Sequence, residues 1–269
     1  MENYWDLIKK IITESDLVLE ILDARLVELS RNEEAEKLIK DIGRPLIFVV
    51  NKSDLVSRKN LKKQVKSLRE KGAVVFVSAK RSRDIKILLY VIKKIFREFG
   101  KREPSLDKEH RAAKGDIIVG VIGYPNVGKS SIINALSHKK KAKVSKKPGT
   151  THGIHWIRAT KEIKMIDSPG IIPLSKDDNI RYGLIGAKNI ESLKNPQSVA
   201  YALINLFSKT NRKNFEALYN IEIKKNLNFL TIIKEIARKR RFFLKGGELD
   251  EFRVCSMIVK DWQEGKLRM

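Results

Sequence analysis

The segment Gly123–Ser130 constrains the fold of this chain more than any other part of the sequence. Its residues, GYPNVGKS, match the pattern G-x-x-x-x-G-K-[ST] and directly follow Asp116–Ile122, a run with the character of a buried strand. The glycines let backbone N–H groups close around a phosphate. The helix expected to follow adds its unpaired amides and the positive end of its dipole. The segment therefore predicts a strand, a phosphate-binding loop and a helix in succession.

Charged and polar residues in and after this loop have the chemistry of a magnesium–nucleotide site. Lys129 is expected to reach the β- and γ-phosphates, and the Ser130 hydroxyl to hold Mg²⁺. Asp167 follows the buried run Ile163–Ile166, where a carboxylate can hold Mg²⁺ through water, and the amide of Gly170 can donate to a γ-phosphate. Asp-Ser-Pro-Gly is also a common turn, so its position after a strand carries the interpretation. The predicted phosphate-binding residues are Asn126, Val127, Gly128, Lys129, Ser130, Ser131 and Gly170.

The motif Asn51-Lys52-Ser53-Asp54 follows another buried run, Leu46–Val50, and predicts a guanine site. A carboxylate accepts two hydrogen bonds from the N1–H and 2-amino groups of guanine, and adenine lacks both donors. A site built on this pairing leaves a buried charge unpaired when adenine enters, so it discriminates strongly. We therefore predict that Asp54 recognises the base, while the Asn51 amide and the Lys52 stem frame it.

A second motif, Ser78-Ala79-Lys80, follows the buried run Ala73–Val77 and is expected to support the same base through backbone contacts. Either base motif, taken by itself, is equally compatible with a polar turn after a strand. Both follow strands of one predicted sheet, and open α/β folds bind ligands at the carboxyl ends of their strands. This shared position favours binding.

Strand-like and helix-like segments alternate through the first part of the chain. Further strands are expected at Leu17–Leu22 and Ile154–Arg158, and helices at Glu33–Ile42, Lys59–Glu70 and Asp84–Phe99. This alternation predicts an α/β fold with a parallel sheet covered by helices on both faces.

The pattern changes twice along the chain. Residues 101–114 are polar and lack periodicity, so we interpret them as a linker within the first domain. After about residue 175 the buried-strand pattern stops, and residues 182–269 read as helices. We therefore expect a nucleotide-binding domain at 1–178 and a smaller, all-α domain at 179–269.

The net charge of +24, from 56 Lys and Arg against 32 Asp and Glu, favours a polyanionic partner, with nucleic acid ahead of a membrane surface. The alternative is a Lys-rich proteome in which lysines cover solvated faces. No apolar run is long enough to span a bilayer. The single cysteine, Cys255, excludes an intramolecular disulfide and any multi-Cys metal site. A cytoplasmic location is expected.

Taken together, the motifs resemble the P-loop GTPases, but their order differs. In ordinary GTPases the phosphate loop comes first, whereas here Asn51 precedes Gly123 by about 70 residues. This order resembles the circularly permuted GTPases of ribosome assembly, the YlqF/YawG-like (RbgA-like) group, over nearly the whole chain. Further matching segments are Asp23-Ala24-Arg25, Pro148-Gly149-Thr150-Thr151, Lys245–Asp250 and Asp261–Lys266.

The resemblance implies GTP hydrolysis with GTP/GDP and Mg²⁺ as cofactors. The catalytic residues would be Lys129, Thr151 and Gly170, and the metal-binding residues Ser130, Thr151 and Asp167. Thr151 corresponds to the switch threonine, and Asn126 to the residue that ligates K⁺ in potassium-stimulated GTPases. Ile171 stands where many GTPases carry a water-orienting Gln, so we expect slow intrinsic hydrolysis. His152 and His155 are candidates to orient water, or are solvent-facing residues.

The resemblance also implies a partner, which is ribosomal RNA or a precursor of the large ribosomal subunit. We expect the chain to be a monomer and not to associate with a membrane. Alternatives are a GTP-gated RNA-binding switch with negligible turnover and a GTPase in tRNA modification or stress signalling. An ATP-using, DNA-associated protein conflicts with Asp54.

Two features of the tail bear on that partner. The basic cluster Arg238–Arg241, beside Phe242 and Phe243, can grip phosphates and stack on bases, or can be a solvated helix end beside core rings. An amphipathic helix is expected farther on, with Gly265 at its C-cap. Its predicted apolar face comprises Leu249, Phe252, Cys255, Ile258, Val259 and Trp262.

Overall fold

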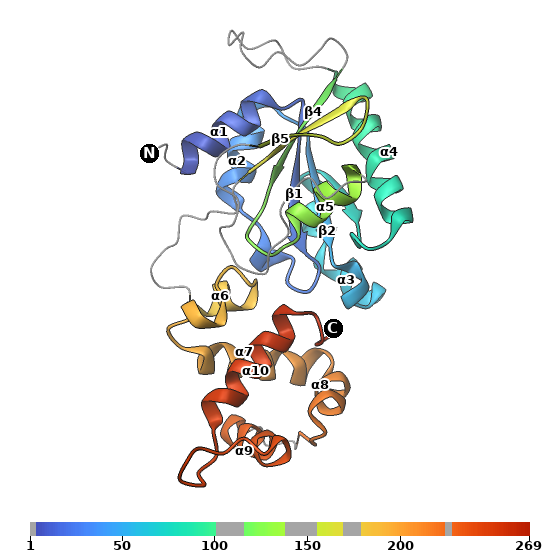
Figure 1. Ribbon diagram of the computed structural model, residues 1–269. Helices are drawn as coiled ribbons and strands as arrows, with labels where there is room; N and C mark the ends of the chain where they lie inside the picture. Colours follow the sequence, from blue (N-terminus) through green and yellow to red (C-terminus); the bar gives the residue numbers. More distant parts are fainter. Residues whose placement is uncertain (1–3, 101–115, 138–154, 169–178, 224–227) are drawn as a thin grey trace. The chain divides into compact units, whose positions relative to one another are not determined.

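A computed structural model of the chain describes residues 4–100, 116–137, 155–168, 179–223 and 228–269 (Figure 1). The chain divides into two compact units, residues 1–173 and 174–269. The predicted linker at 101–114 lies outside the described residues. Each unit is considered by itself below.

The first unit is built on a six-stranded sheet with the order β3-β2-β1-β4-β6-β5. All neighbouring strands are parallel except β5, which runs antiparallel to β6. The strands are β1 (Leu17–Asp23), β2 (Leu46–Asn51), β3 (Ala73–Phe76), β4 (Ile117–Ile122), β5 (His155–Arg158) and β6 (Ile163–Asp167). Each coincides with a predicted run to within one or two residues, which confirms the α/β class.

Helices cover both faces of this sheet, which is why its central strands are apolar on both sides. The helices α1 (Tyr4–Glu14) and α2 (Glu33–Ile42) lie on one side, and α4 (Ser82–Phe99) and α5 (Lys129–Ser137) on the other (Figure 1). Buried residues of α1 and α2 form one cluster with Val18, Ile118 and Ile166 of the strands.

The predicted helix Lys59–Glu70 is two shorter pieces, α3 (Arg58–Gln64) and the 3-10 helix η3 (Ser67–Glu70). The apolar residues of this segment, Leu61, Val65 and Leu68, are buried. The break follows Gln64, whose side chain forms hydrogen bonds with the loop after β1. A long-range contact therefore ends the helix where local periodicity would continue it.

The second unit is helical in all the regular structure that its described residues form, apart from one bridge between Phe243 and Leu249. Its elements are α6 (Asn179–Leu184), η5 (Ile190–Ser192), α7 (Pro196–Thr210), α8 (Arg212–Tyr219), α9 (Phe229–Arg240) and α10 (Glu251–Gln263). A side-chain oxygen caps the first turn of each of the last four, from Asn195, Asn211, Asn228 and Asp250. Local capping chemistry thus sets where these helices begin.

Aromatic rings from α7, α8 and α10 form the centre of this unit. The ring of Phe207 lies 5.8 Å from both Phe215 and Trp262. The Trp262 indole also donates to the carbonyl of Leu184 at the end of α6, at 2.6 Å. Gln263 adds hydrogen bonds to the carbonyls of Gly183 and Lys188. These contacts join α10 to α6.

Two predicted members of the α10 face, Leu249 and Phe252, are wrong. Phe252 is 58% exposed, while Val254 and Cys255 are fully buried. Helix α10 begins only at Glu251, so Leu249 lies before it, and the buried stripe starts at Val254. The C-cap residue is Glu264, one residue before the predicted Gly265, which follows it with a φ of 77°. Among the described helices, none is long and apolar enough to cross a membrane.

Candidate nucleotide-binding site

The sheet topology identifies the edge at which a ligand would bind. Because β1, β2, β3, β4 and β6 are parallel, their carboxyl ends meet at one edge. Strand β1 is central: β2 and then β3 lie on one side of it, and β4 and then β6 lie on the other, so the strand order reverses direction at β1. Open α/β sheets bind ligands in the crevice at such a reversal. The two base motifs, the phosphate loop and the Asp167 motif each lie at the carboxyl end of one of these strands.

Asn51 connects three of the motifs at this edge. Its amide nitrogen donates to the carbonyl of Val127 in the phosphate loop at 2.9 Å. Its amide oxygen accepts from the backbone N–H of Ala79 at 3.3 Å. Asn51 is 3% exposed, so both hydrogen bonds lie inside the protein. The end of β2 thereby ties the phosphate loop to the loop after β3.

The phosphate loop has the backbone geometry that its glycines predict. Gly128 has a φ of +106°, and a Cβ there would lie 2.2 Å from the Asn51 amide nitrogen. Asn126 also has a positive φ, 61°. Helix α5 begins at Lys129, so its unpaired N-terminal amides follow the loop directly. This is the arrangement that binds phosphate at a helix N-terminus.

The Lys129 ammonium is held within the loop by backbone carbonyls. It donates to the carbonyl of Gly123 at 2.8 Å and to that of Tyr124 at 3.1 Å. Burial lowers its pKa to about 8, against the opposing effect of the nearby Asp167 carboxylate. A bound phosphate would reverse this shift, because a second negative charge favours the charged ammonium.

Asp167, at the end of β6, fits the role of a magnesium-binding carboxylate. Its Oδ1 atom is buried and, within the described part of the chain, has no hydrogen-bond partner. Burial raises the pKa of this carboxyl to about 6, while the positive charges of Lys129 and His155 oppose the shift. A divalent cation would supply the charge and the ligand contact that Oδ1 lacks. Ser130, in the first turn of α5, is the second predicted ligand among the described residues.

The base-recognition residues lie at the carboxyl ends of β2 and β3. Asp54 is half-buried in the 3-10 turn η2 (Ser53–Leu55). The backbone N–H of Ser78 is held by the Asp84 carboxylate at 2.9 Å. Lys80 follows as an exposed residue.

Two residues at this edge were given no chemical role by the sequence reasoning. Asp23, the last residue of β1, bonds the Lys52 ammonium at 2.7 Å and is itself paired with Arg25. Sequence had marked Asp23-Ala24-Arg25 only as part of a resemblance. The available signal was a carboxylate directly after a buried strand of the same sheet.

Several predicted residues lie outside the described residues. These are Thr151, Gly170, Ile171 and His152, so their predicted roles stay predictions. His155 is described. It begins β5 and is the register partner of Asp167.

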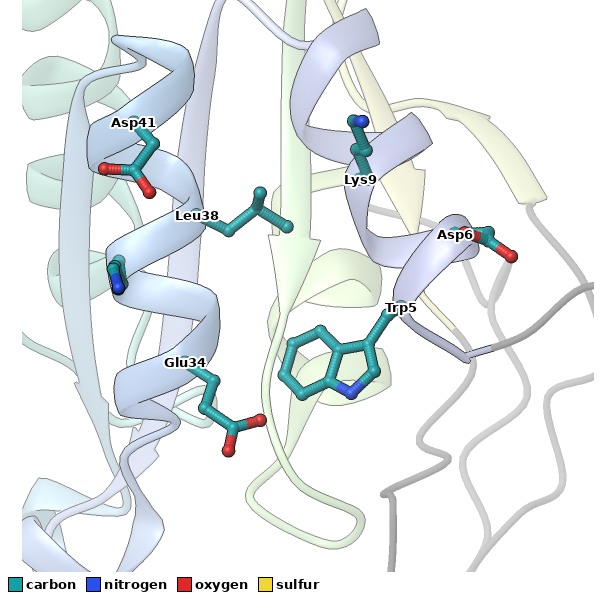
Figure 2. Close-up of a pocket in the computed structure, with 7 residues that line it drawn as sticks. Trp5, Asp6, Lys9, Glu34, Leu38 and Asp41 are labelled. Carbon is teal, nitrogen blue, oxygen red and sulfur yellow. The ribbon is translucent and has the colours of Figure 1, made fainter.

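A separate hollow of about 330 Å³ lies between α1 and α2 (Figure 2). Trp5 and Leu38 point into it from the two helices, and charged residues surround them. These charges are Asp6, Lys9, Glu34, Lys37 and Asp41. None of the predicted nucleotide-binding residues lines this hollow.

Comparison with known proteins agrees with this site. Residues 118–235 match the family described as 50S ribosome-binding GTPase. The match begins in β4, so it contains the phosphate loop and leaves out Asn51–Asp54. That is the result expected when the guanine motif precedes the phosphate loop.

Similarity to curated proteins extends along the chain. It is 40% identical over 264 residues to an uncharacterized GTP-binding protein of Methanocaldococcus jannaschii, covering 97% of this chain and 65% of that protein. It is 33% identical over 267 residues to nucleolar GTP-binding protein 2 of Pneumocystis carinii, covering 98% and 52%. The chain thus spans between about half and two thirds of the length of these relatives.

Two solved structures share the fold. GNP-bound YlqF from T. maritima aligns with a TM-score of 0.59 and 23% identity, over 97% of this chain and 93% of that one. The GDP-bound structure of YlqF gives a TM-score of 0.63 at 22% identity, over 97% and 95%. The motif order, the sheet and these similarities agree with one another: the chain has the fold of YlqF, and it is similar to GTP-binding proteins over nearly its whole length.

Proposed function

We propose that the chain binds and hydrolyses GTP and that its nucleotide state controls binding to ribosomal RNA in a precursor of the large ribosomal subunit. One observation carries the nucleotide part, namely the buried Asn51 that joins the phosphate loop to the base-recognition segments. The names of the relatives, which refer to GTP binding and to the 50S ribosome, support the rest.

Exchange of one atom in the base tests guanine recognition. Xanthine carries a carbonyl where guanine has its 2-amino group, so an amide at residue 54 suits xanthine as the carboxylate suits guanine. Asp54→Asn should lose GDP affinity by at least tenfold and gain affinity for xanthosine diphosphate. Asp41→Asn, the same change at an exposed carboxylate of α2, is the matched control. An Asp54→Asn variant that still prefers GDP would contradict the proposed base site.

The described residues also support phosphoryl transfer. Lys129 would stabilise charge developing on the transferred group, and Asp167 with Ser130 would hold Mg²⁺, which offsets negative charge on the phosphates. We expect slow intrinsic turnover because Ile171 cannot orient water, and we expect stimulation by K⁺ through Asn126. Single-turnover hydrolysis in Na⁺ and in K⁺, with and without ribosomal subunits, measures both expectations. No turnover under any of these conditions would favour the nucleotide-gated switch.

Hydrogen bonds and exposure in the second unit reduce the number of side chains in the basic cluster that are candidates for RNA contact. Lys239 and Arg240 donate to the carbonyls of Asn220 and Leu218 near the end of α8, so they cap that helix. Arg238 and Arg241 are exposed on the same segment, and so is Phe243, at 49%. We therefore assign phosphate contacts to these two arginines and base stacking to Phe243.

Sedimentation with large ribosomal subunits tests the partner. The chain should cosediment with the subunits when a non-hydrolysable GTP analogue is present. It should be released from them when GDP is present. Arg238→Gln combined with Arg241→Gln should weaken cosedimentation, whereas nucleotide binding should stay unchanged. Cosedimentation with tRNA alone would instead favour the tRNA-modification alternative. The cytoplasmic location and the monomeric state stay predictions.

A further inference from the structure

The loop after β1 contains a buried acid–base pair with unusually complete hydrogen bonding. Asp23 Oδ1 accepts from the backbone N–H and the Nε atom of Arg25, both at 3.0 Å, and Oδ2 accepts from the terminal guanidinium nitrogen at 2.7 Å. Both side chains are 2% exposed. Burying two charges is costly and is tolerated only where the geometry is this good. Because the Asp23–Arg25 pair lies at the ligand edge of the sheet, we expect it to have a role in ligand binding as well as in stability.

A third charged group shares the same carboxylate. The Lys52 ammonium donates to Asp23 Oδ2 at 2.7 Å and is 22% exposed. Lys52 belongs to the guanine motif and has a left-handed backbone, with a φ of 60°. Asp23 and Asn51 are register partners on β1 and β2, so the Lys52 stem reaches from the end of one strand to the end of its neighbour. Both ends of this side chain are therefore fixed.

The carboxylate at the centre of this arrangement stays ionised. Burial alone would raise the pKa of Asp23, but the charges of Arg25 and Lys52 and their hydrogen bonds outweigh burial and hold it well below its ordinary range. Burial lowers the pKa of the Lys52 ammonium, while the Asp23 carboxylate opposes that shift.

A helix supports the loop from outside the sheet. The Gln64 side chain at the end of α3 accepts from the backbone N–H of Val27 at 3.1 Å and donates to the carbonyl of Ala24 at 3.1 Å. The Ala24 N–H in turn donates to the Asn51 carbonyl at 2.8 Å. The loop that carries Arg25 is therefore anchored to both α3 and the guanine motif.

We propose that Asp23 and Arg25 are positioning residues that hold the Lys52 side chain in its base-binding arrangement before a nucleotide arrives. This inference rests on the proposed guanine-nucleotide function. A lysine stem has many rotamers, and fixing it in advance removes an ordering cost from binding. Asp23→Asn should therefore weaken affinity for GDP by roughly tenfold, mainly through faster dissociation.

A double-mutant cycle on the full chain separates positioning from a general structural role. Fluorescent GDP is the probe, and the dissociation constants of the wild type, Asp23→Asn, Lys52→Ala and the double variant are compared. Once Lys52 is removed there is no side chain left to position, so Asp23→Asn should then change affinity by less than twofold. An equal loss with and without Lys52 would overturn the proposal.

If Asp23→Asn does not fold, a variant that leaves Asp23 in place and weakens only the anchoring of its loop tests the same proposal. Gln64→Met removes the two hydrogen bonds that anchor the loop but keeps the size of the side chain, and it should weaken GDP affinity two- to fivefold, again only when Lys52 is present. Unchanged affinity in a folded Gln64→Met variant, or a loss that persists without Lys52, would count against the tether. If the wild type binds no guanine nucleotide, the proposed function itself is wrong. If the wild type binds GDP but the variants behave as described above, only the positioning role is wrong.

Discussion

At the scale of single residues, Glu20 is a buried group whose titration affects stability. It lies on β1 with no exposed surface, and one carboxylate oxygen accepts from the Asn32 backbone N–H at 2.8 Å. Within the described chain, the other oxygen has no hydrogen-bond partner. Burial, with a contribution from Glu36, raises its pKa from 4.5 to about 8. The carboxyl is therefore protonated at neutral pH.

The raised pKa sets the sign of a pH effect. The unfolded chain loses the Glu20 proton near pH 4.5, whereas the folded chain keeps it up to about pH 8. The stability contributed by this group is thus complete below pH 4.5 and falls as the pH rises towards 8. Glu20→Gln should raise the free energy of unfolding by roughly 2–4 kcal/mol at pH 8.5 and by much less at pH 5. Urea denaturation at both pH values measures this, with exposed Glu70→Gln as control.

A second residue-scale prediction concerns Gly128. An alanine there would have to adopt a φ of +106° and would place its Cβ 2.2 Å from the Asn51 amide nitrogen. We expect Gly128→Ala to break the Asn51–Val127 hydrogen bond and to reduce GDP affinity at least tenfold. A Cβ at Gly246 would meet nothing within 4 Å, so Gly246→Ala is the matched control. Isothermal titration with GDP compares them, and equal affinities would contradict the role given to Gly128.

At the scale of elements, α10 holds the second unit together through Trp262. Its indole N–H satisfies the Leu184 carbonyl of α6, and its ring packs on Phe207. Trp262→Phe keeps an aromatic ring but leaves that carbonyl unpaired, which costs about 1–3 kcal/mol. Thermal unfolding should show the loss. The exposed Phe252→Ala should change stability by less than about 0.5 kcal/mol, and a larger effect would contradict the corrected boundary of the buried face.

The same elements show how far the sequence could be read. Strands β2, β3, β4 and β6 were predictable because each is a short apolar run followed by a motif with defined chemistry. The end of α3 was not, because it depends on Gln64 bonding a loop about 40 residues away in the sequence. The exposure of Phe252 was also missed, since apolar spacing cannot locate the first turn of a helix.

The candidate site divides in the same way. Local patterns identified Asn51, Gly128, Lys129 and Asp167, because each has a role fixed by its own motif. The tether between Asp23 and Lys52 could not be found, because only the pairing of β1 with β2 places them together. Strand order is a property of the whole sheet, and no window of sequence contains it.

At the scale of the whole molecule, the charge of +24 is unevenly distributed. Residues 1–57 carry eight Lys and Arg against twelve Asp and Glu, whereas residues 181–269 carry 18 against nine. A nucleotide with Mg²⁺ accounts for few of these cations. We therefore infer that the excess serves a larger polyanion, and its position in the chain predicts which segments meet that partner.

Salt dependence of RNA binding tests this distribution. Each lost phosphate contact lowers the slope of log K against log salt by roughly 0.7–0.9. Arg238→Gln with Arg241→Gln should lower the slope by about 1–2, and so should Lys62→Gln with Lys63→Gln in α3. Lys9→Gln with Lys10→Gln, in the acidic first segment, removes the same charge and should leave the slope unchanged. Each of the three double variants removes two positive charges, so only contacts at particular sites can give them different slopes. Equal slopes for all three would mean that RNA binding depends on the net charge alone.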